Sequence, residues 1–428
     1  MRYYSTNGRA PVVKFREALF RGLAPDGGLY LPESIPVFDS SFFTADRSYP
    51  ELAAALIRPF VEEEIPPAVL TEIAAAAFTF PVPLVDLEPG TSILELFHGP
   101  TLAFKDFAAR FMARTMAYFQ DRLGRELTVL VATSGDTGSA VAAGFYGIAG
   151  IRVVILYPAG RVSPLQEQQL TAWGGNVTAL EIAGSFDDCQ RLVKQAFLDW
   201  ELLSCRNLTS ANSINIGRLL PQAVYYAWAW RQVREQDVVF SVPSGNFGNL
   251  TGGLIAVKMG LPTAGFVAAV NANTVFPDYL RTGDYRPRPA RSTISNAMDV
   301  GDPSNFQRIR ALFGDDPGTL RREVSSFGFS DRQTLMAIRD VYERTGYILD
   351  PHTAVGYLGW QRFRRGDTGN RHGIVLATAH PAKFRDCYPE KIREVIAEPQ
   401  RLTEFRRKSR QVQTLPTDYS AFKEFLLD

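Results

Sequence analysis

Lys105 is the residue of this chain whose setting points most directly to chemistry. It stands between Phe104 and Phe107 and is followed at once by Asp106. Burying an ammonium group is costly unless the group is paired or loses its proton. A lysine that loses its proton near neutral pH can form a Schiff base with an aldehyde. The sequence therefore predicts a reactive amine at Lys105, provided that other residues bind an aldehyde beside it.

Two segments have the composition of anion-binding strand ends. The run TVLVATS (128–134) leads into Gly-Asp-Thr-Gly-Ser and an alanine-rich stretch, and VVFSVPS (238–244) leads into the glycine turn GNFGN. Helix N-termini and successive N–H groups in glycine turns attract phosphates. Both segments also have an ordinary structural explanation, because Ser134, Asp136 or Thr137 could simply cap a helix and glycine turns between a strand and a helix are common.

A third polar segment, TSANSINIGRLLPQ (209–222), places Ser213 and Arg218 before a helix rich in aromatic residues. The planar guanidinium group of arginine suits a phosphate or a carboxylate, although a surface salt bridge is the ordinary alternative. Near the C-terminus, GIVLATAHPAKF (373–384) places Thr378 at the end of an apolar strand. These segments supply hydroxyl, guanidinium and backbone donors, and they require a fold that brings them to Lys105.

Composition excludes several classes of protein. The 428 residues are 46% hydrophobic and 21% charged, with a net charge of +1, so no excess charge favours nucleic acid or an anionic membrane. The N-terminal segment lacks the apolar core of a signal peptide, and no apolar run has the length of a membrane span. The three cysteines are widely spaced and the four histidines lack metal-ligand spacing, so we expect no disulfide framework, no metal site and a cytoplasmic protein.

The pattern of the chain indicates two kinds of structure. Residues 1–85 read as a separate, mostly helical unit in which Pro66 and Pro67 separate two helical stretches, and residues 80–90 read as a connector. Short β-branched runs then alternate with helical stretches; the runs are 128–134, 153–158, 177–183, 238–244, 265–271 and 373–379. This alternation predicts a doubly wound α/β fold with buried parallel strands, which bind ligands at their carboxyl ends.

Several motifs taken together resemble the threonine synthases, a fold-type II family of pyridoxal-phosphate enzymes, in their longer bacterial and fungal form. The resemblance runs from about Tyr3 to Phe384 and rests on YYSTNGRAPVVKFREALFRGLAPDGGLYLPE, HGPTLAFKDFAARFMA, TSGDTGSAVA, ILYPAGRVSPLQEQQL, SANSINIGRLLPQ, SVPSGNFGN, STISNAMDV and TAHPAKF. It implies an N-terminal domain over residues 1–85 and a catalytic region over 86–428. Within that region it implies mainly parallel sheets in two lobes, the smaller and mobile one over roughly 95–220.

The same resemblance implies roles for individual residues. Lys105 would hold pyridoxal 5'-phosphate, Thr378 would face its ring nitrogen, and Asp136 would lie beside its 3-hydroxyl. The loop that cradles the cofactor phosphate would consist of Gly245, Asn246, Phe247, Gly248 and Asn249. The substrate phosphate or carboxylate would be bound by Ser134, Thr137, Ser213 and Arg218.

The implied reaction converts O-phospho-L-homoserine and water into L-threonine and phosphate, by γ-elimination of phosphate and β-addition of water. Such a reaction binds two phosphates, and we expect the smaller lobe to close over the substrate to control water. Two alternatives stay open: a related phospho-amino-acid lyase or serine/threonine dehydratase of the same fold, and a catalytically silent ligand-binding homologue. We expect a monomer or a weak homo-oligomer with no nucleic-acid or membrane partner.

Overall fold

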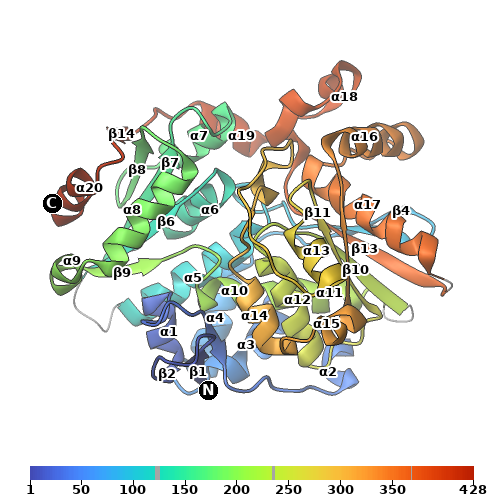
Figure 1. Cartoon of the computed structure of the whole chain (residues 1–428), viewed down its shortest axis with the longest axis horizontal. Helices are drawn as coiled ribbons and strands as arrows, with labels where there is room; N and C mark the ends of the chain where they lie inside the picture. Colours follow the sequence, from blue (N-terminus) through green and yellow to red (C-terminus); the bar gives the residue numbers. More distant parts are fainter. Residues whose placement is uncertain (121–125, 234–236, 368) are drawn as a thin grey trace.

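The computed structural model describes residues 1–120, 126–233, 237–367 and 369–428. Within them, two lobes built on parallel sheets lie side by side, and the N-terminal unit packs beneath both (Figure 1). No helix in these ranges is long and apolar enough to cross a membrane. The predicted doubly wound, mainly parallel α/β fold in two lobes is confirmed.

The N-terminal unit is mostly helical, as predicted, but it also holds a small antiparallel sheet that the sequence pattern did not reveal. The sheet has the order β2-β1-β3, with β1 at Arg2–Ser5, β2 at Val13–Lys14 and β3 at Tyr30–Pro32. These strands are too short to show an alternating pattern. The helices of the unit are α1 (Phe15–Arg21), α2 (Ser40–Thr44), α3 (Tyr49–Val61) and α4 (Pro67–Ala77).

The larger lobe contains a six-stranded sheet that is parallel except at one edge. Its order is β12 (Val324–Gly328), β11 (Gly265–Val270), β10 (Asp237–Pro243), β13 (Arg371–Ala377), β5 (Thr91–Glu95) and β4 (Leu84–Glu88). Only β4 runs antiparallel to its neighbour. The predicted connector at residues 80–90 is therefore wrong in part, because it contains the strand β4 between Pro83 and Pro89. Only Asp86 of this strand is exposed and its other four residues are half-buried, so no clear alternation results.

The smaller lobe contains a five-stranded parallel sheet. Its order is β14 (Val412–Leu415), β8 (Val177–Ile182), β7 (Ile151–Pro158), β6 (Leu127–Ala132) and β9 (Asn207–Ser210). Four of these strands come from the range 95–220 that we expected for this lobe. The fifth, β14, comes from far later in the chain and pairs with β8.

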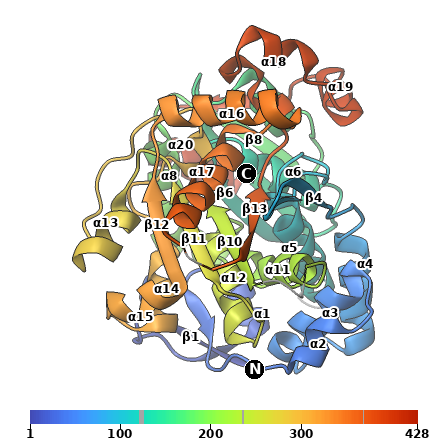
Figure 2. The ribbon, with the colours of Figure 1, turned by 90° about the vertical axis from the view of Figure 1, so that its right-hand side faces the viewer.

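Helices cover both faces of each parallel sheet, which explains why nearly every residue of the central strands is buried and apolar. In the larger lobe, α17 packs on one face through close contacts of Gly356 and Gly359 with the strands. On the opposite face, Tyr226 of α11 packs edge-on against Phe240 of β10. Figure 2 shows the sheet between these two layers. In the smaller lobe, the core beside α8 is separate from the core beside α5 and α6.

The remaining helices complete these layers. Those nearest the smaller sheet are α5 (Lys105–Gln120), α6 (Asp136–Phe145), α7 (Pro164–Thr171), α8 (Phe186–Leu198), α9 (Trp200–Cys205) and α20 (Tyr419–Leu427). The others are α10 (Ile216–Leu219), α11 (Gln222–Trp230), α12 (Gly248–Lys258), α13 (Val275–Thr282), α14 (Phe306–Phe313), α15 (Pro317–Glu323), α16 (Asp331–Thr345), α17 (Pro351–Gly366), α18 (Glu390–Val395) and α19 (Gln400–Arg406), with short 3-10 turns η1 (Asn296–Met298) and η2 (Pro381–Cys387).

Candidate active site

A cavity of about 560 Å³ collects the carboxyl ends of strands from both sheets. The ends of β6, β10 and β13 all contribute lining residues, as the rule for open parallel sheets predicts. Of the predicted site residues, the ones that line the cavity are Lys105, Ser134, Thr137, Ser213, Arg218, Gly245, Asn246, Phe247, Gly248, Asn249 and Thr378. Asp136 is the one predicted site residue that does not line the cavity.

Lys105 enters the cavity at the first turn of α5, from a loop that is fastened to the end of β13. Leu102 adopts a left-handed conformation (φ 58°), and its carbonyl accepts a hydrogen bond from the His380 N–H. The Phe104 N–H donates to the Thr378 carbonyl at 2.9 Å. These backbone bonds place Lys105 close to Thr378, although the two residues are far apart in sequence.

The neighbours of Lys105 have structural roles. Asp106 is buried and accepts hydrogen bonds from the Thr101 N–H and hydroxyl, at 2.8 and 2.7 Å, which closes the preceding loop. Phe107 is buried among aromatic rings that include Tyr49 of the N-terminal unit. Phe104 lines the cavity itself. The start of α5 is thus held by the N-terminal unit and the loop together.

The Lys105 amine has the electrostatic setting of a reactive group. Burial lowers its pKa to about 8; the nearby Asp136 charge acts against this shift, and the charges of Arg218 and Lys383 add to it. An amine with this pKa is about half neutral at pH 8, whereas an ordinary lysine is almost wholly protonated there. At pH 7 about one-tenth of such an amine is neutral, a far larger fraction than for an ordinary lysine, and the shift is in the direction that the sequence analysis expected.

Asp136 and Lys383 form a buried ion pair beside this amine. The Lys383 Nζ lies 2.7 Å from Asp136 Oδ1, and the two side chains are 0% and 4% exposed. Gln166 Nε2 also donates to Asp136 Oδ1, at 3.1 Å, and Lys383 Nζ donates to the Thr101 carbonyl. The positive charges of Lys383 and Lys105 hold the pKa of Asp136 well below its ordinary value despite burial. Asp136 is therefore a carboxylate, and it acts on Lys105 through its charge.

The end of β6 leaves two hydroxyl groups available to a ligand. The Thr133 hydroxyl accepts hydrogen bonds from the N–H groups of Gly135 and Gly138, at 3.0 and 2.9 Å. Thr133 thus caps the start of α6, a role that the ordinary explanation had given to Ser134, Asp136 or Thr137. Ser134 and Thr137 are left to line the cavity.

The loop after β10 is a ready anion cradle. Phe247 has a left-handed backbone (φ 57°), and the Asn249 amide donates to the Pro243 carbonyl at 2.9 Å, which turns the loop back onto its own strand. In the described part of the chain, none of the backbone N–H groups from Gly245 to Asn249 donates to a protein acceptor. Successive N–H groups without partners at the start of a helix form a site for phosphate.

Arg218 supplies a second group of donors. Its Nη1 donates to the Ala211 carbonyl at 2.6 Å, while its buried Nε has no hydrogen-bond partner within the described ranges. Burial lowers its pKa to about 10, so the guanidinium remains charged at neutral pH. A buried, charged donor without a partner at a cavity wall favours an anionic ligand. Ser213 lines the same cavity.

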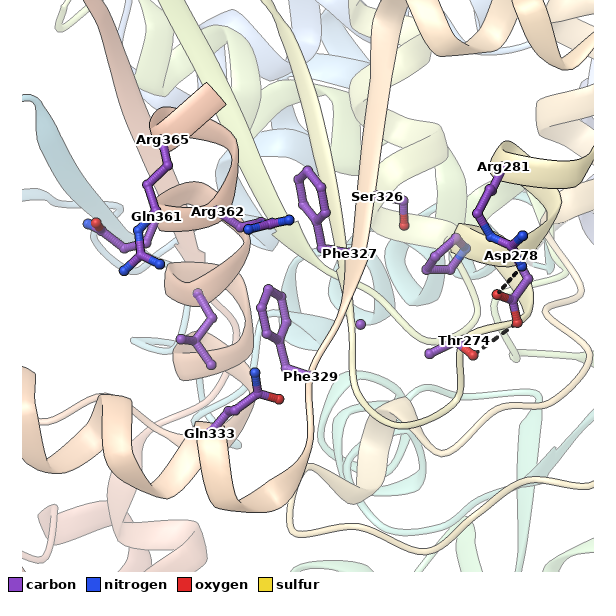
Figure 3. A pocket seen from close by; sticks show the side chains of 13 residues that line it. Thr274, Asp278, Arg281, Ser326, Phe327, Phe329, Gln333, Gln361, Arg362 and Arg365 are labelled. Carbon is purple, nitrogen blue, oxygen red and sulfur yellow. Dashed lines mark hydrogen bonds and ion pairs between the residues drawn. The ribbon is translucent and has the colours of Figure 1, made fainter. Parts of the chain in front are cut away.

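A second cavity of about 560 Å³ opens on the outer side of the larger lobe, among α13, β12 and α17 (Figure 3). Arg281, Arg362 and Arg365 lie around it, and Arg281 is paired with Asp278. None of the predicted site residues lines this cavity, and it holds no lysine. It is therefore separate from the site around Lys105.

Three residues at the site were not identified from the sequence. Lys383 lies in the motif TAHPAKF, and its position five residues after Thr378 could have indicated that it lies near the same strand end. Gln166 lies in LQEQQL, and only its contact with Asp136 distinguishes it from its neighbours. His352 lines the cavity and is bonded through Nδ1 to Asp350 at 2.8 Å, while its Nε2 accepts from the Ala297 N–H. No group of three or more potential metal ligands occurs in the described part of the chain.

The fold and the cavity agree with a comparison against known families. A model described as pyridoxal-phosphate dependent enzyme matches residues 83–378. The parallel sheets, the cavity at their carboxyl ends and this match define a fold-type II pyridoxal-phosphate-dependent enzyme. Models described as threonine synthase N terminus and threonine synthase, C-terminal, match residues 2–78 and 353–426.

The chain belongs to the threonine synthase family. It is 40% identical to the threonine synthase of Escherichia coli K12 and 41% identical to that of Haemophilus influenzae, and each alignment covers 100% of both chains. Among solved structures, pyridoxal-phosphate-bound threonine synthase from Brucella melitensis superposes with a TM-score of 0.92 at 38% identity, covering 100% of this chain and 99% of that one. Yeast threonine synthase gives 0.91 at 34%, covering 99% and 98%.

The residues present fit this cofactor. Pyridoxal phosphate carries a phosphate and an aldehyde, and the cavity offers the free N–H groups of 245–249 for the first and the Lys105 amine for the second. Arg218, whose charged guanidinium lies at the cavity wall, remains for a further anion. The cavity volume of about 560 Å³ lies in the usual range for small-molecule sites.

Proposed function

We propose that this enzyme converts O-phospho-L-homoserine and water into L-threonine and phosphate. The observation that supports this reaction is the presence of two groups of anion donors in the cavity that also holds Lys105. One group is the N–H cradle of residues 245–249, and the other is Arg218 with the hydroxyls of Ser134, Thr137 and Ser213. A cofactor phosphate and a substrate phosphate require two such groups.

In this proposal, Gly245, Asn246, Phe247, Gly248 and Asn249 hold the cofactor phosphate. The Thr378 hydroxyl would serve the ring nitrogen, and Asp136 would tune Lys105 through its charge. When bound, pyridoxal phosphate supplies the electron sink that allows a proton to leave the substrate's Cα. Lys105 would hold the cofactor aldehyde, and its Nζ would move protons at the substrate's Cα and Cβ. Arg218, Ser134, Thr137 and Ser213 bind and orient the substrate's phosphate or carboxylate.

The test of the reaction is a product assay. Purified enzyme loaded with pyridoxal phosphate should release threonine and phosphate from O-phospho-L-homoserine in equal amounts. Phosphate with 2-oxobutyrate and no threonine would instead show the related lyase or dehydratase activity. If the enzyme binds O-phospho-L-homoserine but forms none of these products, it is a catalytically silent ligand-binding homologue.

The rate at which cofactor-free enzyme captures pyridoxal phosphate should depend on pH through Lys105. The neutral amine is the form that attacks the aldehyde, and its pKa is about 8. The capture rate should therefore rise about tenfold per pH unit up to pH 8 and level off above it. Asp136→Asn should move the midpoint to lower pH, because the Asp136 charge raises the pKa of Lys105. The measurement is the absorbance change on mixing between pH 6.5 and 9.5, and a rate still rising at pH 9.5 would contradict the assignment.

Gly245→Ala should weaken cofactor binding. An added Cβ would lie 2.7 Å from Met298 Cα and 3.0 Å from the Ala297 carbonyl oxygen, so the backbone on one side would have to move. Overpacking of this kind costs about 1–3 kcal/mol, which corresponds to about 5- to 150-fold in affinity if the whole cost falls on the cofactor-bound state. Gly366→Ala, whose added Cβ has no atom within 4 Å, is the matched control. Titration of each cofactor-free variant with pyridoxal phosphate gives the dissociation constants. Equal constants for Gly245→Ala and Gly366→Ala would contradict the assignment of residues 245–249 to the cofactor phosphate.

We also propose the division into an N-terminal domain over 1–85 and a catalytic region over 86–428, with a mobile smaller lobe near 95–220 that closes over the substrate. We further propose a monomer or weak homo-oligomer, and a cytoplasmic location, for which the three unpaired cysteines are suited. Light scattering on the purified enzyme measures the oligomeric state. Identical lobe positions in ligand-free and analogue-bound crystals would contradict closure.

A further inference from the structure

The N-terminal unit reaches the active site through hydrogen bonds to one loop. This substrate-side loop, residues 211–215, connects β9 to α10 and contains Ser213. Asn215 Nδ2 at its end donates to the Leu19 carbonyl of α1, at 2.8 Å. The Ala211 carbonyl at its start accepts from Arg218 Nη1. The loop therefore contains Ser213 and bonds to Arg218, two of the four residues that we assign to the substrate, and the N-terminal unit bonds to the loop.

Arg308 of α14 makes a second and stronger connection between the same two parts. Its Nε donates to the Tyr30 carbonyl of β3 at 3.1 Å, its Nη1 to the Ser213 carbonyl at 3.2 Å and its Nη2 to the Ile214 carbonyl at 2.6 Å. One guanidinium group thus bonds the N-terminal unit on one side and two successive carbonyls of the substrate-side loop on the other.

Burial of the Arg308 side chain at this position is energetically unfavourable. Its side chain is 0% exposed, and within the described ranges it has no carboxylate partner. Burial lowers its pKa to about 9, because removing the guanidinium from water disfavours its charged form. An apolar side chain would fill this position more cheaply. What only arginine supplies is a rigid fork that fixes several acceptors in one plane.

Asn305, one turn before Arg308, extends the connection to the Ser213 side chain. Arg308 Nη1 donates to Asn305 Oδ1 at 2.8 Å, and Asn305 Nδ2 donates to Ser213 Oγ at 3.3 Å. The preceding Ser304 N–H donates to Asn246 Oδ1 in the phosphate cradle. The start of α14 therefore touches both proposed anion sites as well as the N-terminal unit.

We propose that Arg308 is a positioning residue through which the N-terminal unit fixes the substrate-side loop and so sets the affinity for the phosphorylated substrate. This inference rests on the proposed function for the roles of Ser213 and Arg218. It gives the N-terminal unit a part in substrate binding in addition to its packing against the catalytic lobes.

The test is Arg308→Lys in the holoenzyme, because lysine keeps the charge and cannot form the fork. We expect KM for O-phospho-L-homoserine to rise about 10-fold or more, from the loss of two or more hydrogen bonds, while kcat changes less than about threefold. Hydrogen exchange followed by mass spectrometry should accelerate in residues 211–219, and the cofactor absorbance should stay at the wild-type level.

Two controls lie on the same helix. Arg310→Lys changes an exposed arginine paired with Asp315, and Gln307→Ala removes a contact with Thr6 of the N-terminal unit that does not reach the loop. Both should keep KM and loop exchange within about twofold of wild type. If Arg308→Lys yields no folded holoenzyme, Asn305→Ala should show the same two changes in smaller degree, since it removes the Asn305 bonds to Ser213 and to Arg308 but leaves the Arg308 bonds to the Ser213 and Ile214 carbonyls.

The outcomes separate this inference from the proposed function. Wild-type KM and wild-type exchange in residues 211–219 of Arg308→Lys would overturn the positioning role. Equal losses of kcat and cofactor content without a rise in KM would also overturn it, because they indicate a general loss of structure. Failure of the wild type to form threonine would refute the proposed function, whereas the exchange measurement would still decide whether Arg308 holds the loop.

Discussion

Lys105→Ala is expected to lower threonine formation by about 10³-fold or more, since proton transfer by a positioned side chain contributes up to about 10⁴-fold and the same amine holds the cofactor. The lowered pKa of Lys105 and its position in the cavity wall lead to this expectation. Threonine and phosphate are measured separately, so that elimination without threonine formation is also seen. In the wild type, treatment with borohydride should fix the cofactor on the peptide that contains Lys105.

The control for this prediction is Lys391→Ala, which changes an exposed lysine on α18. It should keep wild-type activity. Equal activity of Lys105→Ala and the wild type, or borohydride labelling of a peptide without Lys105, would remove the central assignment of the site. Restored activity on adding a small primary amine to Lys105→Ala would support a role in proton transfer.

Lys383→Met is expected to lower the free energy of unfolding by about 3–5 kcal/mol. The substitution keeps the length of the side chain but leaves the Asp136 carboxylate, 4% exposed, without its cationic partner at 2.7 Å. Adding Asp136→Asn should restore much of the loss, because the carboxylate charge that Lys383→Met leaves without its partner is then removed and the new amide can still bond to Gln166. Denaturant unfolding of the cofactor-free variants gives these differences.

Lys423→Met is the matched control for a lysine at the surface. Lys423 bonds to Asp199 and Glu201 at 2.8 and 2.7 Å, distances like that of the buried pair, but water reaches all three groups. Its loss should be much smaller than that of Lys383→Met. A loss of equal size in the two variants, or a double variant no more stable than Lys383→Met, would show that burial of the Asp136 charge is not the cause.

The sequence predicted the parts of the site that depend on local chemistry. Strand runs bounded by glycine, proline or small polar residues were enough to predict β6, β10 and β13, and the rule that ligands bind at carboxyl ends then placed Ser134, Gly245 and Thr378 in one cavity. Lys105 was predicted from its apolar neighbours, and its surroundings in the fold agree. The roles given to these residues came from family resemblance, and they remain proposals.

What could not be predicted depends on contacts between distant parts of the chain. Nothing near Thr133 in sequence shows that its hydroxyl, and not that of Ser134, caps α6; backbone geometry decides this. The pairing of Lys383 with Asp136 requires the two lobes to meet. In sequence, Arg308 does not differ from other arginines of amphipathic helices. Its role is visible only from its contacts with β3 and the substrate-side loop in the folded chain. Short strands such as β1 and β9 carry too few residues to show a period.

The pairing of β14 with β8 has a consequence for synthesis of the chain. The smaller sheet draws four strands from residues 127–210, but its edge at β8 is completed only by residues 412–415. On the ribosome, the outer edge of β8 must therefore stay unpaired while the four later strands of the larger sheet, β10 to β13, are translated. Unpaired edges recruit strands from other chains. The nascent protein thus passes through a stage in which a nearly complete lobe is exposed to misassembly, and truncation before residue 412 would make that stage permanent.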